Sequence, residues 1–526
     1  MWQSNWREEL PQLQSSEWDI VIIGGGITGA GILLEAARRG LRALLVEQRD
    51  FAWGTSSRSS KLIHGGLRYL KEGKPGLTRD SVRERQHLLQ QAPGLVEPQS
   101  FAFADYRGRK PGRWMFALGL AIYDRMAGQS ARHYFARDEF LMLAPNVGQE
   151  ELQGGLCYQD AKTDDARLVM RVLQEAVAAG GRAVNYMAAS SLMRREQHVE
   201  GAVLTDATNQ RQYEVKAKVV INATGAWADH LRKTQGAAAK LRPLRGSHLI
   251  LPAWRLPLAQ AVSFMHPDDG RPVFAFPWEG VTLVGTTDVD HQSDLQQEAV
   301  IDQKEVDYLM TALAYQFPQS ALTVGDVIST YAGVRPVIDT GKSDPSKEGR
   351  DHAVWMEHGL LTVTGGKLTT FRLIALDALK HAAPYLPGWD AQLEARTIFT
   401  DSTALPYDVR IGTQQRIRLQ GRYGALAIEV LHCAQENELE SIDGTESIWA
   451  ELRWTARNEA VVHLEDLMLR RTRLGLLLRG GGIEMLPRIR AICQSELRWD
   501  DARWEGEQAA YLALWQRCYA PPKQDQ

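Results

Sequence analysis

Apolar runs that end in glycine are the first regular feature of the chain. Residues 19–23 form such a run, which leads into the glycine-rich turn 24–29 and then into a helical stretch that Gly40 ends. A second apolar run closes at Glu47. Because glycine commonly follows the last turn of a helix, this order of run, turn, helix and run predicts a βαβ unit over residues 18–47.

Two more apolar runs end in the same way much further along the chain. Residues 215–223 are followed by the small-residue turn 224–225, and residues 360–363 by a pair of glycines at 365–366. Strands of one parallel sheet can lie far apart in sequence when other segments are inserted between them. We therefore expect one discontinuous domain that holds all three strands.

The remaining sequence predicts two further kinds of structure. Short β-like runs separated by proline and glycine fill residues 241–290, which favours an antiparallel sheet. From about residue 404 the pattern changes to arginine-rich amphipathic helices, notably over 448–478, with a glycine break at 480–482. The proline-containing segment 384–387 is the expected linker before these helices.

These patterns predict an α/β protein with a Rossmann-like dinucleotide-binding domain, an antiparallel-sheet domain for the substrate, and an all-helical C-terminal domain. We expect the first domain in three pieces, because the second domain interrupts it twice. The expected bounds are 16–90, 155–235 and 330–385 for the first domain, 91–154 and 236–329 for the second, and 390–526 for the third.

Composition narrows the classes of function. The 526 residues carry a formal net charge of -3 and a pI near 6.5, so no global attraction to nucleic acid is expected. The four cysteines contain no C-x-x-C pair, which argues against a disulfide framework or a structural zinc site, and we expect no metal. A reducing cytoplasm is the simplest location.

Three segments bear on membrane contact. The N-terminus has no apolar core of signal-peptide length, and no run reaches the roughly 18 apolar residues of a spanning helix. Residues 114–123 are apolar and follow a basic stretch; we favour a buried helix there, with an interfacial anchor as the alternative. The arginines of 470–473 either face anionic lipid or belong to a solvated helix face.

The first turn carries a dinucleotide motif. Gly24, Gly26 and Gly29 fit G-x-G-x-x-G directly after a strand and at the start of a helix, where backbone N–H groups can approach a pyrophosphate. Glu47 closes the second strand, where its carboxylate can accept a hydrogen bond from a ribose hydroxyl. These residues alone are compatible with either NAD or FAD.

The stretch after Glu47 favours FAD. Thr55, Ser56 and Ser57 supply hydroxyls for phosphate oxygens, and Gly65 and Gly66 permit close approach to a flat ring. A nicotinamide enzyme has no evident need for this stretch. The turns at the other two strand ends are expected to approach the same cofactor, which adds Thr224, Gly225, Gly365 and Gly366.

Several longer motifs carry a specific resemblance. The segments GGGITGAG, GTSSRSSKLIHGGLRYL, TDDARLV, INATGAWAD, RGSH, GTTD, YAGVRP and GGKLTT together resemble the FAD-dependent glycerol-3-phosphate dehydrogenases, from about Asp19 to about Leu379. The resemblance implies an FAD-binding domain of the glutathione-reductase type. It also implies oxidation of sn-glycerol 3-phosphate to dihydroxyacetone phosphate, with electrons passed to a membrane quinone at the inner leaflet of the cytoplasmic membrane.

The resemblance also implies the residues of a substrate site. A dianionic phosphate in a partly buried site needs guanidinium, ammonium and hydroxyl donors in turn-like segments. A secondary alcohol that loses a hydride needs a base for its hydroxyl proton, and imidazole suits this near neutral pH. The positions matched to the family are His248 and Arg335 as catalytic residues and Arg68, Tyr69, Thr287, Arg350 and Lys367 as substrate-binding residues.

Other readings of these residues stay open. His64 competes with His248 but fits a structural role better, and Asp164 and Asp165 are expected to cap the helix that follows them. An oxidase that reduces oxygen on the same fold, or a non-catalytic flavin-binding redox sensor, are the alternative functions. We expect FAD to be bound without a covalent link, and a homodimer stays open.

Overall fold

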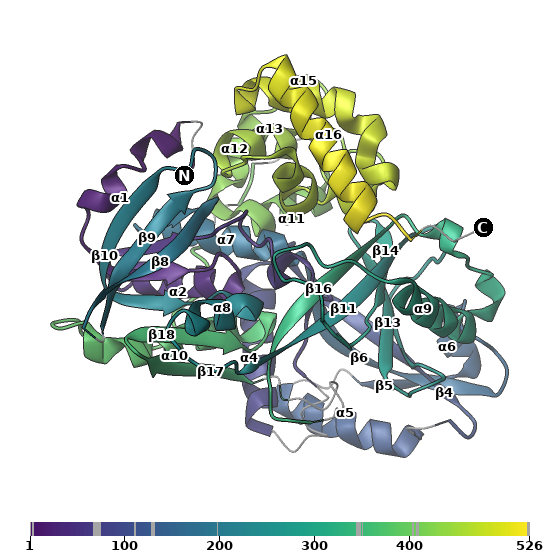
Figure 1. Cartoon of the computed structure of the whole chain (residues 1–526). Coiled ribbons are helices and arrows are strands. Elements are labelled where there is room, and N and C mark those ends of the chain that lie inside the picture. Colours follow the sequence, from purple (N-terminus) through teal and green to yellow (C-terminus); the bar gives the residue numbers. More distant parts are fainter. Residues whose placement is uncertain are drawn as a thin grey trace.

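The structure is a computed structural model and describes residues 2, 5–66, 75–109, 112–127, 132–196, 198–342, 349, 351–401, 404–406 and 410–522. This part of the chain forms two sheets, each with helices packed on it, and a separate group of helices at the C-terminal end (Figure 1). The α/β class with a helical C-terminal domain is therefore confirmed.

The first sheet is built around parallel strands in the order β18-β10-β1-β2-β7, with β17 antiparallel at one edge. A hairpin of β8 and β9 pairs with the first half of β10. The three strands that the apolar runs predict, β1, β10 and β18, are thus direct neighbours. The strand bounds are β1 (Trp18–Ile23), β2 (Ala43–Val46), β7 (Arg182–Val184), β8 (Met187–Arg195), β9 (His198–Asp206), β10 (Gln212–Asn222), β17 (His352–Glu357) and β18 (Leu360–Gly365).

Both faces of this sheet are covered, which explains why its strands are continuously apolar. In β1, Ile20 and Ile22 face helices α2, α7 and α10, whereas Val21 and Ile23 face the side that the β8–β9 hairpin covers. The helices predicted from sequence are present. Their bounds are α2 (Ile27–Ala37), α7 (Asp165–Ala178) and α10 (Phe371–Ala382), with the short α1 (Gln12–Ser15) and α8 (Ala228–Lys233) nearby.

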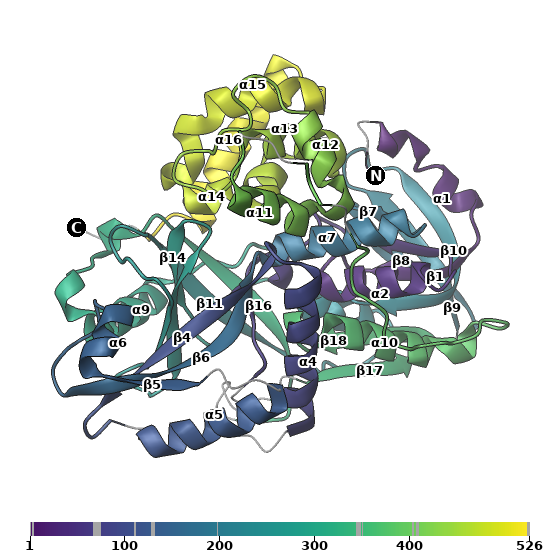
Figure 2. The same ribbon diagram turned by 180° about the vertical axis from the view of Figure 1, so that it is seen from behind.

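The second sheet is mainly antiparallel and follows the order β15-β11-β14-β13-β12-β4-β6-β3, with β16 paired to β11 and β5 to β6. Helices α4, α5, α6 and α9 accompany it (Figure 2). The bounds are β3 (Leu62–Ile63), β4 (Val96–Tyr106), β5 (His133–Ala136), β6 (Leu152–Thr163), β11 (Leu241–Pro252), β12 (Ala261–Met265), β13 (Pro272–Trp278), β14 (Val281–Gly285), β15 (Val289–Asp290), β16 (Ser329–Ile338), α4 (Pro75–Gln91), α5 (Arg113–Ala127), α6 (Arg137–Leu143) and α9 (Gln303–Gln316).

The sheets differ from the expected domains at three places. Strand β3 lies within the expected first-domain piece 16–90 but belongs to the second sheet. Residue 155 falls inside β6 and residue 330 inside β16, and both strands belong to the second sheet. Strand β6 pairs along its length with β4, and β16 pairs along its length with β11. Sequence patterns do not reveal which strands pair. For this reason the expected bounds placed parts of these strands in the first domain.

The C-terminal helices pack on each other and on both sheets. The glycine break is present, because Gly480, Gly481 and Gly482 have φ values of 59°, 70° and 76°. Helices of this group are α11 (Thr413–Tyr423), α12 (Ala427–His432), α13 (Trp449–Asn458), a π-helical turn (Asp466–Arg471), α14 (Leu474–Leu477), α15 (Leu486–Leu497) and α16 (Asp501–Cys518).

The arginine-rich segment of this group is buried, so both surface roles considered for it were wrong. Arg470 and Arg471 donate to the carboxylate of Asp50, at distances of 2.6 to 2.8 Å, and Arg473 donates to Asp164 at 2.9 Å. These three arginine side chains are at most 2% exposed. The acceptors lie in the first domain, and the arginines therefore join the C-terminal helices to it.

Helix α5 departs from the favoured expectation of a buried helix. Leu120 and Tyr123 are buried, but Trp114, Met115 and Leu118 are 79%, 65% and 64% exposed. Hence only one side of the helix packs on the protein. Within the described residues, no helix combines the length and the apolar composition that crossing a bilayer requires.

Candidate active site

A groove runs along the ends of the parallel strands β1, β10 and β18. The three glycine turns predicted from the apolar runs all line it, although almost 350 residues separate the first from the last. Crevices at the carboxyl ends of parallel strands are where open α/β sheets bind their ligands. The predicted residues that line this groove are Gly24, Gly26, Glu47, Thr55, Ser56, Thr224, Gly225, Gly365, Gly366 and Lys367.

The first turn requires glycine for steric reasons. Gly24 has φ 119°, and a Cβ on it would lie 2.5 Å from the carbonyl oxygen of Ala223 in the next strand. A Cβ on Gly29 would lie only 1.9 Å from the carbonyl oxygen of Gly24. Gly29 does not line the groove; it lets helix α2 start close behind the turn. The first backbone N–H groups of α2 consequently face the groove, as phosphate binding needs.

Glu47 stands at the end of β2 and is fixed by backbone donors. Its Oε2 accepts from the N–H of Gly25 at 2.7 Å and its Oε1 from the N–H of Arg49 at 2.9 Å. Burial raises the pKa of this carboxyl, while the two N–H donors oppose the rise. The carboxylate lines the groove at the position predicted for ribose contact.

Of the three predicted residues of the hydroxyl-rich stretch, Thr55 and Ser56 line the groove and Ser57 does not. Ser56 Oγ accepts from the N–H of Ile27 at 2.9 Å, at the start of α2. Ser57 is buried and its hydroxyl donates to the carbonyl of Gly54 at 3.4 Å, so it points away from the groove. Sequence reasoning missed other residues of this groove, which include Trp53, Ser59 and Trp227.

The segment around His64 meets the third glycine turn. Thr369 donates to the carbonyl of His64 at 3.3 Å, which gives His64 a structural contact. The N–H of Gly65 donates to Asp160 Oδ1 at 2.9 Å, and Gly66 has φ 80°. Gly65 and Gly66 are adjacent to this turn but do not line the groove. Arg68, Tyr69 and Arg350 lie outside the described residues.

The predicted base and the predicted catalytic arginine share one face of the β11–β16 pair. His248 lies opposite Tyr331, and Arg335 lies four residues further along β16 on the same face. Between them Gly246 pairs with Gly333. The guanidinium of Arg335 lies over Gly246, and Arg58 lies over Gly333. A Cβ on Gly246 would lie 2.5 Å from Arg335 Nη2.

Strand β16 lies beside the groove. Thr55 donates its hydroxyl to the carbonyl of Val334, and Tyr331 donates its hydroxyl to the carbonyl of Ser59 at 2.9 Å. Pro336 lines the groove itself. The fold therefore brings the second sheet to the edge of the cofactor groove at β16.

His248 is buried and neutral. Its ring stacks on Tyr331 with centroids 4.6 Å apart, and Nε2 lies 2.9 Å from Ser60 Oγ. Nδ1 is buried and has no hydrogen-bond partner among the residues that the structure describes. Burial, with the nearby cations Arg335 and Lys61, holds the pKa of this imidazole well below its usual value. A neutral imidazole is the form that accepts a proton.

Arg335 is half-buried and held by neighbours from the loop after β14. Its Nη1 donates to Asp288 at 2.9 Å and its Nη2 to the hydroxyl of Thr286 at 3.2 Å. Thr287 has another environment: its hydroxyl donates to Glu305 at 2.6 Å and accepts from the N–H of Ser247 at 2.8 Å. These internal bonds argue against the predicted substrate contact of Thr287. Thr286 is the threonine beside Arg335.

Asp164 and Asp165 begin α7, as predicted. Asp164 Oδ1 accepts from the N–H of Arg167 at 3.2 Å, which is an N-cap bond. Both carboxylates also accept from arginines of the C-terminal helices, so they connect the start of α7 to those helices.

Comparison with known proteins agrees with this geometry. Residues 19–372 match the model of the FAD-dependent oxidoreductase family, and residues 390–504 match that of the C-terminal domain of alpha-glycerophosphate oxidase. An aerobic glycerol-3-phosphate dehydrogenase of Staphylococcus aureus is 34% identical over 493 residues, which cover 88% of this chain and 87% of that protein.

Solved structures show the same fold. The glycerol-3-phosphate dehydrogenase of Bacillus halodurans, complexed with FAD, is 27% identical, covers both chains in full and has a TM-score of 0.77. The L-alpha-glycerophosphate oxidase of Mycoplasma pneumoniae, with FAD bound, is 20% identical over 72% of this chain and 98% of that chain, with a TM-score of 0.55.

Fold and groove together define an FAD-dependent oxidoreductase. The glycine turns, the start of α2 beside the groove and the groove along the strand ends fit FAD. Within this class, the chain belongs to the family of aerobic glycerol-3-phosphate dehydrogenases.

Proposed function

We propose that this enzyme oxidises sn-glycerol 3-phosphate to dihydroxyacetone phosphate and passes the electrons to a membrane quinone. The observation that carries the proposal is the placement of a buried, neutral His248 and of Arg335 on the same face of the β11–β16 pair, which lies beside the FAD groove. Similarity to aerobic glycerol-3-phosphate dehydrogenases supports the choice of substrate.

In the proposed reaction, separate residues accept the proton and bind the substrate phosphate. FAD, when bound, supplies the acceptor for the hydride that leaves C2. His248 takes the proton of the C2 hydroxyl, so that the alcohol loses two electrons and two hydrogens and becomes a ketone. Arg335 and Lys367 bring positive charge from β16 and from the third glycine turn to the substrate phosphate.

Anaerobic mixing tests the substrate and the acceptor separately. Glycerol 3-phosphate should bleach the absorbance of the oxidised flavin, whereas free glycerol should not, because it lacks the phosphate that the cations recognise. A quinone analogue should then restore the absorbance faster than oxygen does. Equal bleaching by glycerol contradicts the phosphate assignment, and fast reoxidation by oxygen identifies an oxidase instead.

Arg335→Ala should raise the substrate concentration needed for flavin reduction by about tenfold to a hundredfold, since a hydrogen bond to a charged group contributes about 1.5–3 kcal/mol. FAD content should stay the same, because Arg335 is not among the residues that line the FAD groove. Arg335→Lys keeps the charge but not the fork geometry and should recover part of the loss. Loss of flavin from Arg335→Ala contradicts the assignment.

Electron transfer to a membrane quinone requires contact with the inner leaflet of the cytoplasmic membrane, and α5 is the best candidate for it. Trp114, Met115, Leu118 and Ile122 are exposed at helical spacing. Arg113 at the start of the helix stacks on Trp114, with its Cζ 5.2 Å from the ring centroid. An apolar stripe with tryptophan and arginine is typical of helices that lie in the membrane interface.

Vesicle binding tests the role of α5. The double variant Trp114→Ser, Leu118→Ser should bind anionic phospholipid vesicles at least tenfold more weakly, because burying one large apolar side chain contributes about 1.5–3 kcal/mol. Ile483→Ser is the matched control: Ile483 is 49% exposed, and it belongs to the C-terminal helices, at the end of the molecule opposite α5 (Figures 1 and 2). Equal cosedimentation of the double variant and the wild type contradicts this role.

A further inference from the structure

One buried carboxylate organises the segment that contacts His248. Asp165 Oδ2 accepts from the N–H and the hydroxyl of Ser59, at 2.9 and 2.7 Å. Its Oδ1 accepts from Lys61 Nζ at 2.9 Å and also from the guanidinium of Arg473. A carboxylate with four such donors fixes both Ser59 and Lys61, and Ser60 lies between them.

Lys61 is held in an unusual environment. Its φ is 55°, a left-handed conformation that costs free energy in a residue with a side chain. Its ammonium is fully buried, lies over the rings of Trp278 and Tyr331 at 5.0 and 4.6 Å, and donates to the carbonyl of Ser57 at 3.0 Å. The surroundings therefore impose one conformation on this turn.

The residue that this turn presents is Ser60. Its hydroxyl is 2.9 Å from His248 Nε2, and among the described residues it is the one hydrogen-bond partner of the His248 ring. The stacked Tyr331 is bound to the same segment, because its hydroxyl donates to the carbonyl of Ser59. The position of the imidazole thus depends on the position of the 59–61 turn.

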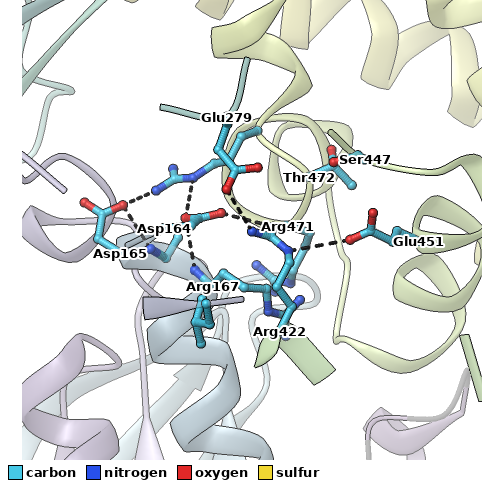
Figure 3. Close-up of polar contacts among 12 residues, drawn as sticks. Asp164, Asp165, Arg167, Glu279, Arg422, Ser447, Glu451, Arg471 and Thr472 are labelled. Carbon is cyan, nitrogen blue, oxygen red and sulfur yellow. Dashed lines mark hydrogen bonds and ion pairs between the residues drawn. The ribbon is translucent and has the colours of Figure 1, made fainter. Parts of the chain in front are cut away.

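The C-terminal helices complete this arrangement from the far side. Arg473 donates to Asp164 at 2.9 Å, to Asp165 and to the carbonyl of Ser57 at 3.2 Å, and Arg422 donates to Asp164 at 3.1 Å. Figure 3 shows Asp164 and Asp165 among side chains that include Glu279 and Arg422. The side chains of both aspartates have no exposed surface.

We infer that Ser60 is a positioning residue that orients the imidazole of His248 for proton transfer, and that Arg473, acting through Asp165, holds Ser60 in place. The helical C-terminal domain accordingly helps to position a catalytic residue of the second sheet. The inference rests on the proposed role of His248 as the base.

Ser60→Ala tests the first step. The rate of flavin reduction at saturating glycerol 3-phosphate should fall about tenfold to a hundredfold, because small displacements of a catalytic group have effects of this size. FAD content and substrate affinity should not change. Ser60→Thr keeps the hydroxyl and should recover most of the rate. Ser329→Ala is the control. It removes another buried hydroxyl of the same sheet, which donates to the carbonyl of Leu476 at 2.6 Å, and it should leave the reduction rate unchanged.

A double-mutant cycle separates positioning from a general loss of structure. If Ser60 acts through His248, Ser60→Ala should have no further effect in a His248→Ala background. Additive effects, or a Ser60→Ala enzyme with the wild-type rate, overturn the inference alone. An unchanged rate in His248→Ala by itself overturns the proposed base and the inference with it.

Arg473→Lys tests the second step, since it keeps the charge but cannot bind Asp164 and Asp165 together. It should slow reduction several-fold, and the effect should disappear when Ser60 is already alanine. If Arg473→Lys does not fold, Ser59→Ala replaces it, because it removes the 2.7 Å bond to Asp165 together with the 3.0 Å bond that the N–H of Lys61 donates to the same hydroxyl. A slower rate that persists in the Ser60→Ala background contradicts the link between Arg473 and His248.

Discussion

His248→Ala should slow flavin reduction by glycerol 3-phosphate by about a hundredfold to ten-thousandfold, the usual contribution of a positioned general base. Bound FAD and the affinity for substrate should be preserved, because His248 does not line the FAD groove. His248→Gln keeps a side chain of similar reach on Tyr331 without supplying a base, and it should be as slow. Rapid-mixing absorbance gives the rate, and a wild-type rate in either variant contradicts the assignment.

The pH dependence of the wild-type rate offers an independent check. Because burial and two nearby cations hold the pKa of His248 well below 6.5, the imidazole stays neutral as the pH falls through 6.5. The reduction rate should therefore remain level there and decline only at considerably lower pH. A decline centred between pH 6.5 and 7 means that the base is another group or that His248 is solvated when substrate is bound.

Asp50→Asn should lower the free energy of unfolding by about 3–5 kcal/mol, because removing one partner of a buried ion pair leaves the other charge uncompensated. Arg470 and Arg471 both donate to this carboxylate, and none of the three side chains is more than 1% exposed. Denaturant titration gives the difference. Asp501→Asn is the matched control, since Asp501 pairs with Arg490 on the surface and should show no measurable change.

The same substitution has a defined pH signature. The two arginines lower the pKa of Asp50 from 3.8 to about 2. A carboxyl with a lowered pKa stabilises the fold fully above pH 3.8 and loses that contribution as the pH falls towards 2. The stability difference between wild type and Asp50→Asn should thus be constant at neutral pH and shrink in acid. A difference that grows in acid contradicts the ion pairing.

The groove could be predicted from sequence because local chemistry dictates it. Gly24 and Gly29 have no room for a Cβ, and a buried parallel strand must be apolar on both faces. These requirements leave a pattern that is readable without the fold. Three such junctions predicted a discontinuous sheet, and β1, β10 and β18 are indeed neighbours.

Charged and amphipathic segments were less predictable. A run such as 470–473 is normally solvated, and nothing within it indicates that Asp50, more than 400 residues away, accepts from it. The apolar residues of α5 were expected to be buried, but several are exposed. An apolar pattern does not indicate whether another part of the protein covers it. Among the serines after residue 54, spacing alone could not tell Ser57, which turns inward, from Ser60, which reaches His248.

Sequence by itself thus determined the α/β class, the FAD-binding turns and the family, since each depends on residues close together in the chain or on motifs long enough to be specific. Tertiary structure alone decided how Asp165 binds Ser59, Lys61 and Arg473 together, and which serine contacts His248. Those contacts join segments about 100 to 400 residues apart, and their stability comes from shared burial of opposite charges, which no local pattern encodes.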